Sequence, residues 1–115
     1  MKKRVLSISY DQAILKTRQY ILEQEGLEVV SASGFSDAIA QCKNGKFALV
    51  VLGHSLSPQD KTAFANELRE HCACPILSIR RPGQSKHPDA DYSVDAGEGP
   101  QAMVAVVREA LGISN

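Results

Sequence analysis

The 115-residue chain has no tryptophan, only 5% aromatic residues and no net charge, because 13 basic residues balance 13 acidic ones. A core must therefore be built mainly from Val, Ile, Leu and Ala side chains. A neutral chain has no electrostatic field that favours nucleic acid, so we expect this domain alone to bind neither DNA nor RNA. The length suits one domain with a hydrophobic core, which we expect to span residues 1–115.

Long apolar segments and a paired set of cysteines are also missing. The apolar stretch before Asp11 is too short for a secretion signal, and no segment has the length of a membrane-spanning helix. We therefore expect a cytoplasmic protein without a membrane partner. The cysteines, Cys42, Cys72 and Cys74, are odd in number, so a disulfide framework is not expected.

Short apolar and β-branched runs alternate with segments of helical periodicity. The runs predict strands at 5–9, 27–30, 47–52, 75–79 and 92–94. The run 47–52 is apolar without interruption, which is typical of a strand buried on both faces in a parallel sheet. Alternation of strands and helices favours an α/β fold in which helices cover both faces of such a sheet.

Polar residues and glycines mark the helix ends. Asp11, Ser36 and Ser57 are predicted N-caps, with Pro58 at the first helical position; Gly26 and Gly45 are predicted to end the first two helices. The predicted inner faces carry Ile14, Leu15, Ile21 and Leu22; Ala38, Ile39 and Cys42; Ala63, Phe64, Leu68 and Cys72; and Met103, Val104, Val106, Val107, Ala110 and Leu111.

One helix of the alternating pattern is missing. The segment 80–89, between the last two predicted strands, contains Pro82, Gly83 and Pro88 and almost no apolar residue. Such a composition predicts a loop or a single short turn.

Two segments carry a family resemblance. Residues 26–39 (GLEVVSASGFSDAI) and 90–94 (ADYSV) resemble the second strand and helix, and the approach to the fifth strand, of receiver domains of bacterial response regulators. The resemblance extends over nearly the whole chain. It implies a flavodoxin-like (βα)5 fold with a parallel five-stranded sheet in the order 2-1-3-4-5, with the fourth helix shortened or missing.

The residues that give receivers their chemistry are different here. Ser9 and Tyr10 match the two acids that hold Mg²⁺ in the family, and Asp11 follows one position later. Gly53 matches the phosphate-accepting aspartate, so no phosphoacceptor is expected. One carboxylate is a poor Mg²⁺ site, and phosphoryl transfer to a side chain requires that side chain. We therefore expect no catalysis, no metal and no cofactor.

The remaining signature positions show an exchange of charge. Arg80 matches the phosphate-sensing hydroxyl residue and Asp95 matches the conserved lysine, whereas Tyr92 matches the aromatic residue of the switch. We expect Arg80 to form a standing ion pair with Asp95 or with Asp11, which would hold the strand ends in one state.

Other polar residues allow more than one interpretation. His54, Arg80 and Arg81, with Gly53, are predicted to form an anion or nucleotide site at the carboxyl ends of the strands, where α/β sheets bind ligands. Alternatively, the arginines belong to a solvated basic loop with Lys86 and His87, since no glycine-rich phosphate loop is present.

Three further features have a functional and a structural interpretation. His54 beside Ser55 suggests an activated nucleophile, or a loop histidine without a catalytic role. His71 and the Cys72–Cys74 pair suggest a metal or redox site, or packing of small apolar side chains. Tyr92 is either a contact residue for a partner or a packed aromatic at a sheet edge.

The sequence thus predicts a phosphorylation-independent pseudo-receiver that binds another protein, or a second copy as a homodimer, within two-component-type signalling. The alternative is a sensor of a small anion or nucleotide at the strand ends. A third interpretation is an ordinary receiver whose output domain lies outside this sequence.

Overall fold

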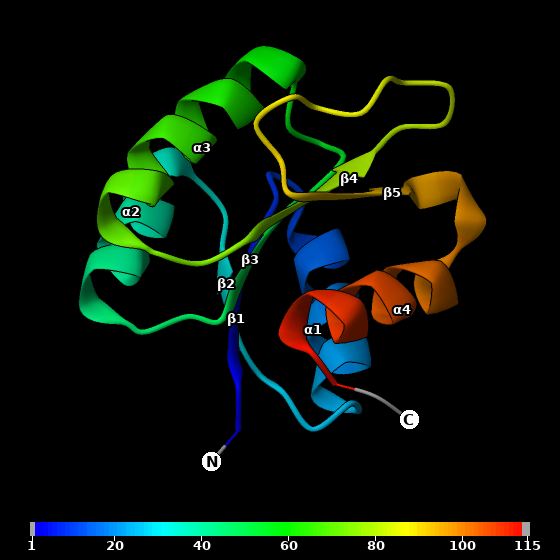
Figure 1. The fold of residues 1–115 in the computed structure, drawn as a ribbon, viewed down its shortest axis with the longest axis horizontal. Helices are drawn as coiled ribbons and strands as arrows, with labels where there is room; N and C mark the ends of the chain where they lie inside the picture. Colours follow the sequence, from blue (N-terminus) through cyan, green and yellow to red (C-terminus); the bar gives the residue numbers. More distant parts are fainter. Residues whose placement is uncertain (1, 114–115) are drawn as a thin grey trace.

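A computed structural model describes residues 2–113 and shows one parallel sheet in the order β2-β1-β3-β4-β5 (Figure 1). The strands are β1 (Arg4–Ile8), β2 (Glu28–Ala32), β3 (Leu49–Leu52), β4 (Ile76–Arg80) and β5 (Tyr92–Asp95). The predicted parallel five-stranded sheet and its strand order are therefore confirmed.

Helices cover both faces of the sheet. They are α1 (Gln12–Glu23), α2 (Phe35–Asn44), α3 (Pro58–His71) and α4 (Pro100–Leu111), with a single 3-10 turn η1 (Ala96–Glu98) before α4. Helices α2 and α3 lie on one face and α1 and α4 on the other (Figure 1). In the described residues, every helix is too short or too polar to span a lipid bilayer.

The central strand contributes to both cores. Val50 and Leu52 pack on the side of α2 and α3, whereas Leu49 and Val51 pack on the side of α1 and α4. All four residues are buried, as the uninterrupted apolar run predicts. Gly53 is the next residue after this buried strand, so it lies at the carboxyl end of β3 in the middle of the sheet.

Most predicted helix boundaries are confirmed. The carboxylate of Asp11 accepts from the N–H groups at the start of α1, and Ser57 Oγ accepts from Asp60 N at 3.1 Å to cap α3. Gly26 has a φ of 82°, the left-handed conformation expected after α1. Gly45 follows α2 directly.

Two predictions about the helices are wrong. Ser36 is not an N-cap, because α2 already begins at Phe35 and Gly34 precedes it without a side-chain cap. Ala63 is exposed, and Ala65 takes its place on the inner face of α3. The other predicted residues of this face, Phe64, Leu68 and Cys72, are buried, and only Ala63 was misplaced, since the small side chain of alanine fits an exposed or a buried position.

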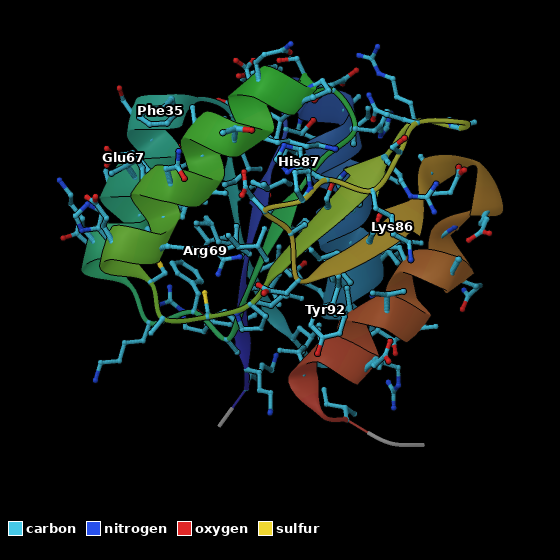
Figure 2. All side chains as sticks on the ribbon, turned by 45° about the horizontal axis from the view of Figure 1, so that its top comes forward. Phe35, Glu67, Arg69, Lys86, His87 and Tyr92 are labelled. Atoms are coloured by element: carbon cyan, nitrogen blue, oxygen red, sulfur yellow. A yellow bond between two sulfur atoms is a disulfide. The ribbon has the colours of Figure 1, made fainter. Side chains whose placement is uncertain are left out.

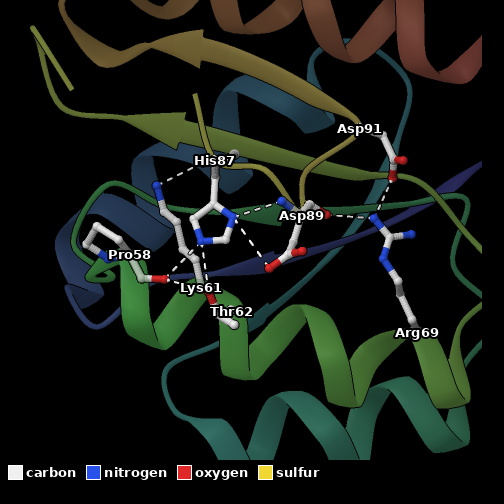
Figure 3. A network of polar contacts seen from close by, with 8 residues as sticks. Pro58, Lys61, Thr62, Arg69, His87, Asp89 and Asp91 are labelled. Atoms are coloured by element: carbon white, nitrogen blue, oxygen red, sulfur yellow. Dashed lines mark hydrogen bonds and ion pairs between the residues drawn. The ribbon is translucent and has the colours of Figure 1, made fainter. Parts of the chain in front are cut away.

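The crossover from β4 to β5 contains no helix, as predicted, and a side chain holds it on α3 (Figure 3). His87 Nε2 donates to Pro58 O at 2.9 Å and lies 3.1 Å from Thr62 Oγ1. His87 Nδ1 accepts from Asp89 N at 3.1 Å, which places the ring proton on Nε2. Arg69 of α3 also donates to Asp89 O, at 2.7 Å, so polar side-chain contacts bind the loop in place of a helix face.

The cysteines correct the sequence prediction. Cys42 of α2 and Cys72 at the end of α3 are joined as a disulfide, with Cα atoms 6.1 Å apart. Both residues are buried, as expected, but packing is not their only contact. Their separation of 30 residues gave no pairing signal, because only the packing of α2 on α3 brings them together.

Candidate functional site

Gly53 follows β3 directly, is buried, and has no room for a side chain. Its N–H donates to Ile8 O at 2.9 Å. A β-carbon at this position would lie 2.9 Å from Ile8 O and 3.2 Å from both terminal nitrogens of Arg18. A backbone oxygen at that distance cannot yield without moving β1. The position that the sequence predicts to match the acceptor is therefore closed by backbone on one side and by a guanidinium on the other.

The guanidinium comes from Arg18 of α1, which is only 5% exposed. Its Nη1 donates to Ser7 Oγ at 3.2 Å, and no carboxylate in residues 2–113 forms an ion pair with it. Burial lowers the Arg18 pKa to about 10, so the group stays charged at neutral pH. Sequence reasoning missed Arg18, although its spacing from Leu15 and Leu22 puts it on the inner face of α1.

A second buried cation reaches the strand ends from α3. Lys61 is 2% exposed, and its Nζ donates to Ser78 Oγ at 2.9 Å and to Ile79 O at 2.8 Å. Burial, together with the charge of Arg81, lowers the Lys61 pKa to about 8. Lys61 was also missed, although it precedes Phe64 by three residues on the inner face. The chain thus buries two cations that are hydrogen-bonded only to neutral oxygen atoms. Lys61 lies at the end of β4, and Arg18 lies beside Gly53, which follows β3.

The positions of the family's acid pair hold a hydroxyl network. Ser9 Oγ lies 2.8 Å from Ser55 Oγ, and Tyr10 OH donates to Asp60 Oδ2 at 2.8 Å. Burial and the hydrogen bond to Asp60 raise the Tyr10 pKa to about 12. Asp11 Oδ1 accepts from two backbone N–H groups of α1. One carboxylate that caps a helix does not fit the oxygen set that Mg²⁺ requires.

The predicted ion pair at the strand ends is present. Arg80 Nη1 lies 3.4 Å from Asp95 Oδ2, and the two residues are neighbours in the register of β4 and β5. Arg80 Nε also donates to Ser93 Oγ at 3.0 Å, and Asp95 Oδ1 accepts from Gly97 N at 2.7 Å. Arg80 pairs with Asp95 and not with Asp11, whose carboxylate faces the start of α1.

The other predicted anion-binding residues are partly engaged. Arg81 Nε donates to His54 O at 3.0 Å, and the Arg81 side chain is exposed. His54 Nδ1 is buried and has no hydrogen-bond partner among the described residues. Burial, followed by the charges of Arg18 and Arg81, lowers the His54 pKa, so the ring is neutral at neutral pH. The imidazole makes no hydrogen bond to Ser55, and the nucleophile interpretation has no geometric support.

The remaining predicted residues lie away from this crevice. Tyr92, labelled in Figure 2, begins β5 opposite Leu77, at the other end of the strand from Asp95. It is half-buried against the core on the side of α1 and α4. Cys74 is a half-buried free thiol whose pKa burial raises, and its neighbour Cys72 is engaged with Cys42. His71 and the cysteines therefore do not form one metal or redox site.

A cavity of about 320 Å³ opens beside the crevice, between α1 and the start of α4. Its walls include Ile14, Ile21, Ile79, Val94 and Met103, and Arg18 and His54 lie at its polar side. A second cavity of about 500 Å³ lies under the 81–91 loop and is lined by polar residues, among them Lys61 and His87.

No family model matches the chain. Among curated proteins, it is 30% identical over 80 residues to the alkaline phosphatase synthesis transcriptional regulatory protein PhoP of Bacillus subtilis. That match covers 69% of this chain and 33% of PhoP, so the chain spans about a third of its relative.

Solved structures match almost the whole chain. A CheY-like response regulator receiver domain from Methanospirillum hungatei has a TM-score of 0.83 at 22% identity, covering 97% of this chain and 95% of its own. Chemotaxis protein CheY4 of Vibrio cholerae has a TM-score of 0.83 at 16% identity, covering 96% and 100%. The chain therefore has the fold of response regulator receiver domains, and part of its sequence resembles PhoP.

Proposed function

We propose that the chain is a receiver-like signalling module that works without phosphorylation. The observation that carries the proposal is the closed position of Gly53, where a β-carbon would meet Ile8 O and the Arg18 guanidinium. A receiver needs an acceptor carboxylate and a nearby Mg²⁺ site. Here the first position has no side chain, and the second holds Ser9 and Tyr10 in a hydroxyl network.

Buried cations strengthen the proposal. A phosphorylated receiver gains negative charge at the strand ends, whereas this chain holds two basic residues there, Arg18 and Lys61, both almost fully buried. The ion pair between Arg80 and Asp95 adds a fixed link between β4 and β5. These interactions are present without any modification, which favours one standing conformation.

A module without a covalent switch would act through its surface. We propose that it binds a protein partner, or a second copy of itself, and that the face around Tyr92 is one such contact. Tyr92 is half-buried at the start of β5, on the side of the sheet that α4 covers. A protein partner is proposed because the chain has the receiver fold and part of its sequence resembles PhoP.

The test is treatment with acetyl phosphate and Mg²⁺, followed by intact mass and an amide NMR spectrum. We expect neither to change, whereas a receiver that carries the acceptor aspartate should gain one phosphoryl group under the same conditions. A mass gain of one phosphoryl group in this chain would reject the proposal. Light scattering over a range of concentrations then separates self-association from binding to a different protein.

The alternative prediction, an anion or nucleotide site made by His54, Arg80 and Arg81, has weaker support. Arg80 is neutralised by Asp95, and Arg81 is exposed and donates to a backbone oxygen. A phosphate group at this place would have to compete with both interactions.

A further inference from the structure

The most unusual feature of the interior is a positive charge without a negative partner. Arg18 is 5% exposed and donates one hydrogen bond, to the neutral hydroxyl of Ser7. A guanidinium carries five N–H donors, and a buried charge is costly unless it is paired. In residues 2–113 no ion pair compensates it. The side chain therefore keeps free N–H donors at the cavity that it lines.

A second unsatisfied group lies at the same wall. His54 Nδ1 is buried without a hydrogen-bond partner in the described part of the chain. Nδ1 of a neutral imidazole is a donor or an acceptor according to the tautomer, and buried polar atoms in native proteins are normally satisfied. Arg18 and His54 both line the cavity between α1 and α4. The two residues thus line the same cavity, Arg18 with free N–H donors and His54 with an imidazole whose Nδ1 is buried.

The rest of that cavity is apolar. Ile14 and Ile21 of α1, Ile79 of β4, Val94 of β5 and Met103 of α4 form most of its wall. Its volume of about 320 Å³ is at the lower end of the range for small-molecule pockets, about 300–1,000 Å³. Such a wall accommodates a small apolar body, not a nucleotide with its charged phosphates and polar sugar.

The acidic residue of the cavity wall, Asp95, is paired with Arg80 and so repels a bound anion little. Asp95 also lines the cavity, but its two carboxylate oxygens accept from Arg80 and from Gly97 N. Its charge is thereby compensated by Arg80. The uncompensated charge at the cavity is the positive charge of Arg18.

We propose that this cavity binds a small organic carboxylate with an apolar body, its carboxylate on the free N–H donors of the Arg18 guanidinium, beside the His54 imidazole. The site goes beyond the proposed function and does not depend on it. It differs from the predicted anion site at Arg80 and Arg81, because its cation is on α1 and its walls are apolar. An occupant would contact α1, β5 and α4 together, and so would stiffen the packing of α4 on the sheet.

The experiment is a titration of the whole chain, followed by methyl NMR in buffer of low chloride. The probes are phenylacetate and 4-methylpentanoate, with phenylacetamide as the neutral isostere and inorganic phosphate as the anion without an apolar body. We expect both carboxylates to shift the methyl resonances of Ile14, Ile79 and Val94 in a saturable manner. The amide and phosphate should bind at least about tenfold more weakly, as the loss of a charge-assisted hydrogen bond or of apolar contact implies.

Two variants locate the charge. Arg18→Met should bind phenylacetate and phenylacetamide equally, whereas Lys16→Met, an exposed position on the same helix, should keep the preference. Equal binding of carboxylate and amide by the native chain would overturn the proposal. So would the absence of saturable shifts with either carboxylate up to millimolar concentrations, or tighter binding of phosphate at the same methyl groups. If Arg18→Met does not fold, the comparison of probes on the native chain still decides.

Discussion

The Arg18 guanidinium lies so close to Gly53 that a β-carbon on residue 53 would sit 3.2 Å from both of its terminal nitrogens. One residue comes from the inner face of α1 and the other from the end of β3. Each explains the other, because only a residue without a side chain leaves the space that the buried guanidinium fills. The absence of a side chain at residue 53 is therefore a property of the packing and not of one position alone.

Gly53→Ala should destabilise the fold. The added methyl group would overlap Ile8 O and press on Arg18, and overpacking of this kind costs about 1–3 kcal/mol of unfolding free energy. Urea denaturation measures the change. Gly34→Ala is the matched control, because a β-carbon there meets nothing within 4 Å and its cost should stay below about 1 kcal/mol. Equal stability of the Gly53 variant and the native chain would show that the position is not closed.

Lys61 should make stability rise with pH above neutrality. Its folded pKa is about 8, against an ordinary value of 10.5, so between these values the unfolded chain binds more protons than the folded one. The unfolding free energy should increase by roughly 1–2 kcal/mol from pH 8 to pH 9.5, relative to Lys61→Met. Denaturation of both proteins at several pH values checks this. Tyr10 acts in the opposite direction, but only above pH 10, because its folded pKa is about 12.

If the unfolding free energy of the native chain and of Lys61→Met changed with pH by the same amount, the lowered pKa of Lys61 would be contradicted. The comparison with the variant is needed because burial also raises the pKa of Cys74, and that contribution to the pH dependence is common to both proteins. Lys61→Met also loses the hydrogen bonds to Ser78 and Ile79, so only the pH dependence of the difference is diagnostic.

The pair Arg80–Asp95 should show measurable coupling. Their side chains are 22% and 20% exposed, so solvent screens them less than a surface pair, and we expect a coupling free energy of about 1 kcal/mol. A double-mutant cycle with Arg80→Gln and Asp95→Asn gives the value. The same cycle on the more exposed pair Arg4–Glu28 should give a smaller value that disappears at high salt. Additive effects at Arg80 and Asp95 would mean that the pair does not link β4 to β5.

His87→Ala should release the loop between β4 and β5. The variant loses the hydrogen bonds to Pro58 O and from Asp89 N, each worth about 1 kcal/mol (Figure 3). Amide hydrogen exchange across residues 81–91 should become faster, while exchange in β1 and β3 should not change. Lys86→Ala, at the exposed neighbouring position, is the control. Unchanged exchange in the loop of the His87 variant would show that other contacts hold it.

The disulfide between Cys42 and Cys72 should be detectable chemically. Alkylation of the native chain without reductant should label Cys74 alone, and after reduction all three cysteines. A bridge across 30 residues should stabilise the fold by about 3–4 kcal/mol, so reduction should lower the urea midpoint. Labelling of three thiols before reduction would reject the bond and leave the pair as buried packing.

Local patterns were sufficient for the architecture. The apolar run before Gly53, the N-caps Asp11 and Ser57, and the prolines of the 80–89 segment each act through neighbours in the chain, so they predicted β3, α1, α3 and the missing helix. The prediction of Ser36 as the N-cap of α2 was wrong. Several small residues stand near the start of this helix, and the structure places Gly34 at the N-cap position. The pairing of Arg80 with Asp95 could also be predicted, because the register of parallel neighbours brings the ends of β4 and β5 together.

The sequence by itself determined that the residue after β3 is a glycine, which carries no carboxylate whatever surrounds it. Only the tertiary structure decided what fills the space instead. Arg18 and Lys61 look like ordinary surface residues in a linear pattern, and their burial depends on how α1 and α3 lie on the sheet. The disulfide and the cavity between α1 and α4 likewise exist only after helices far apart in the sequence have packed. Burial and desolvation depend on contacts across the whole fold, and for this reason a local pattern cannot specify them.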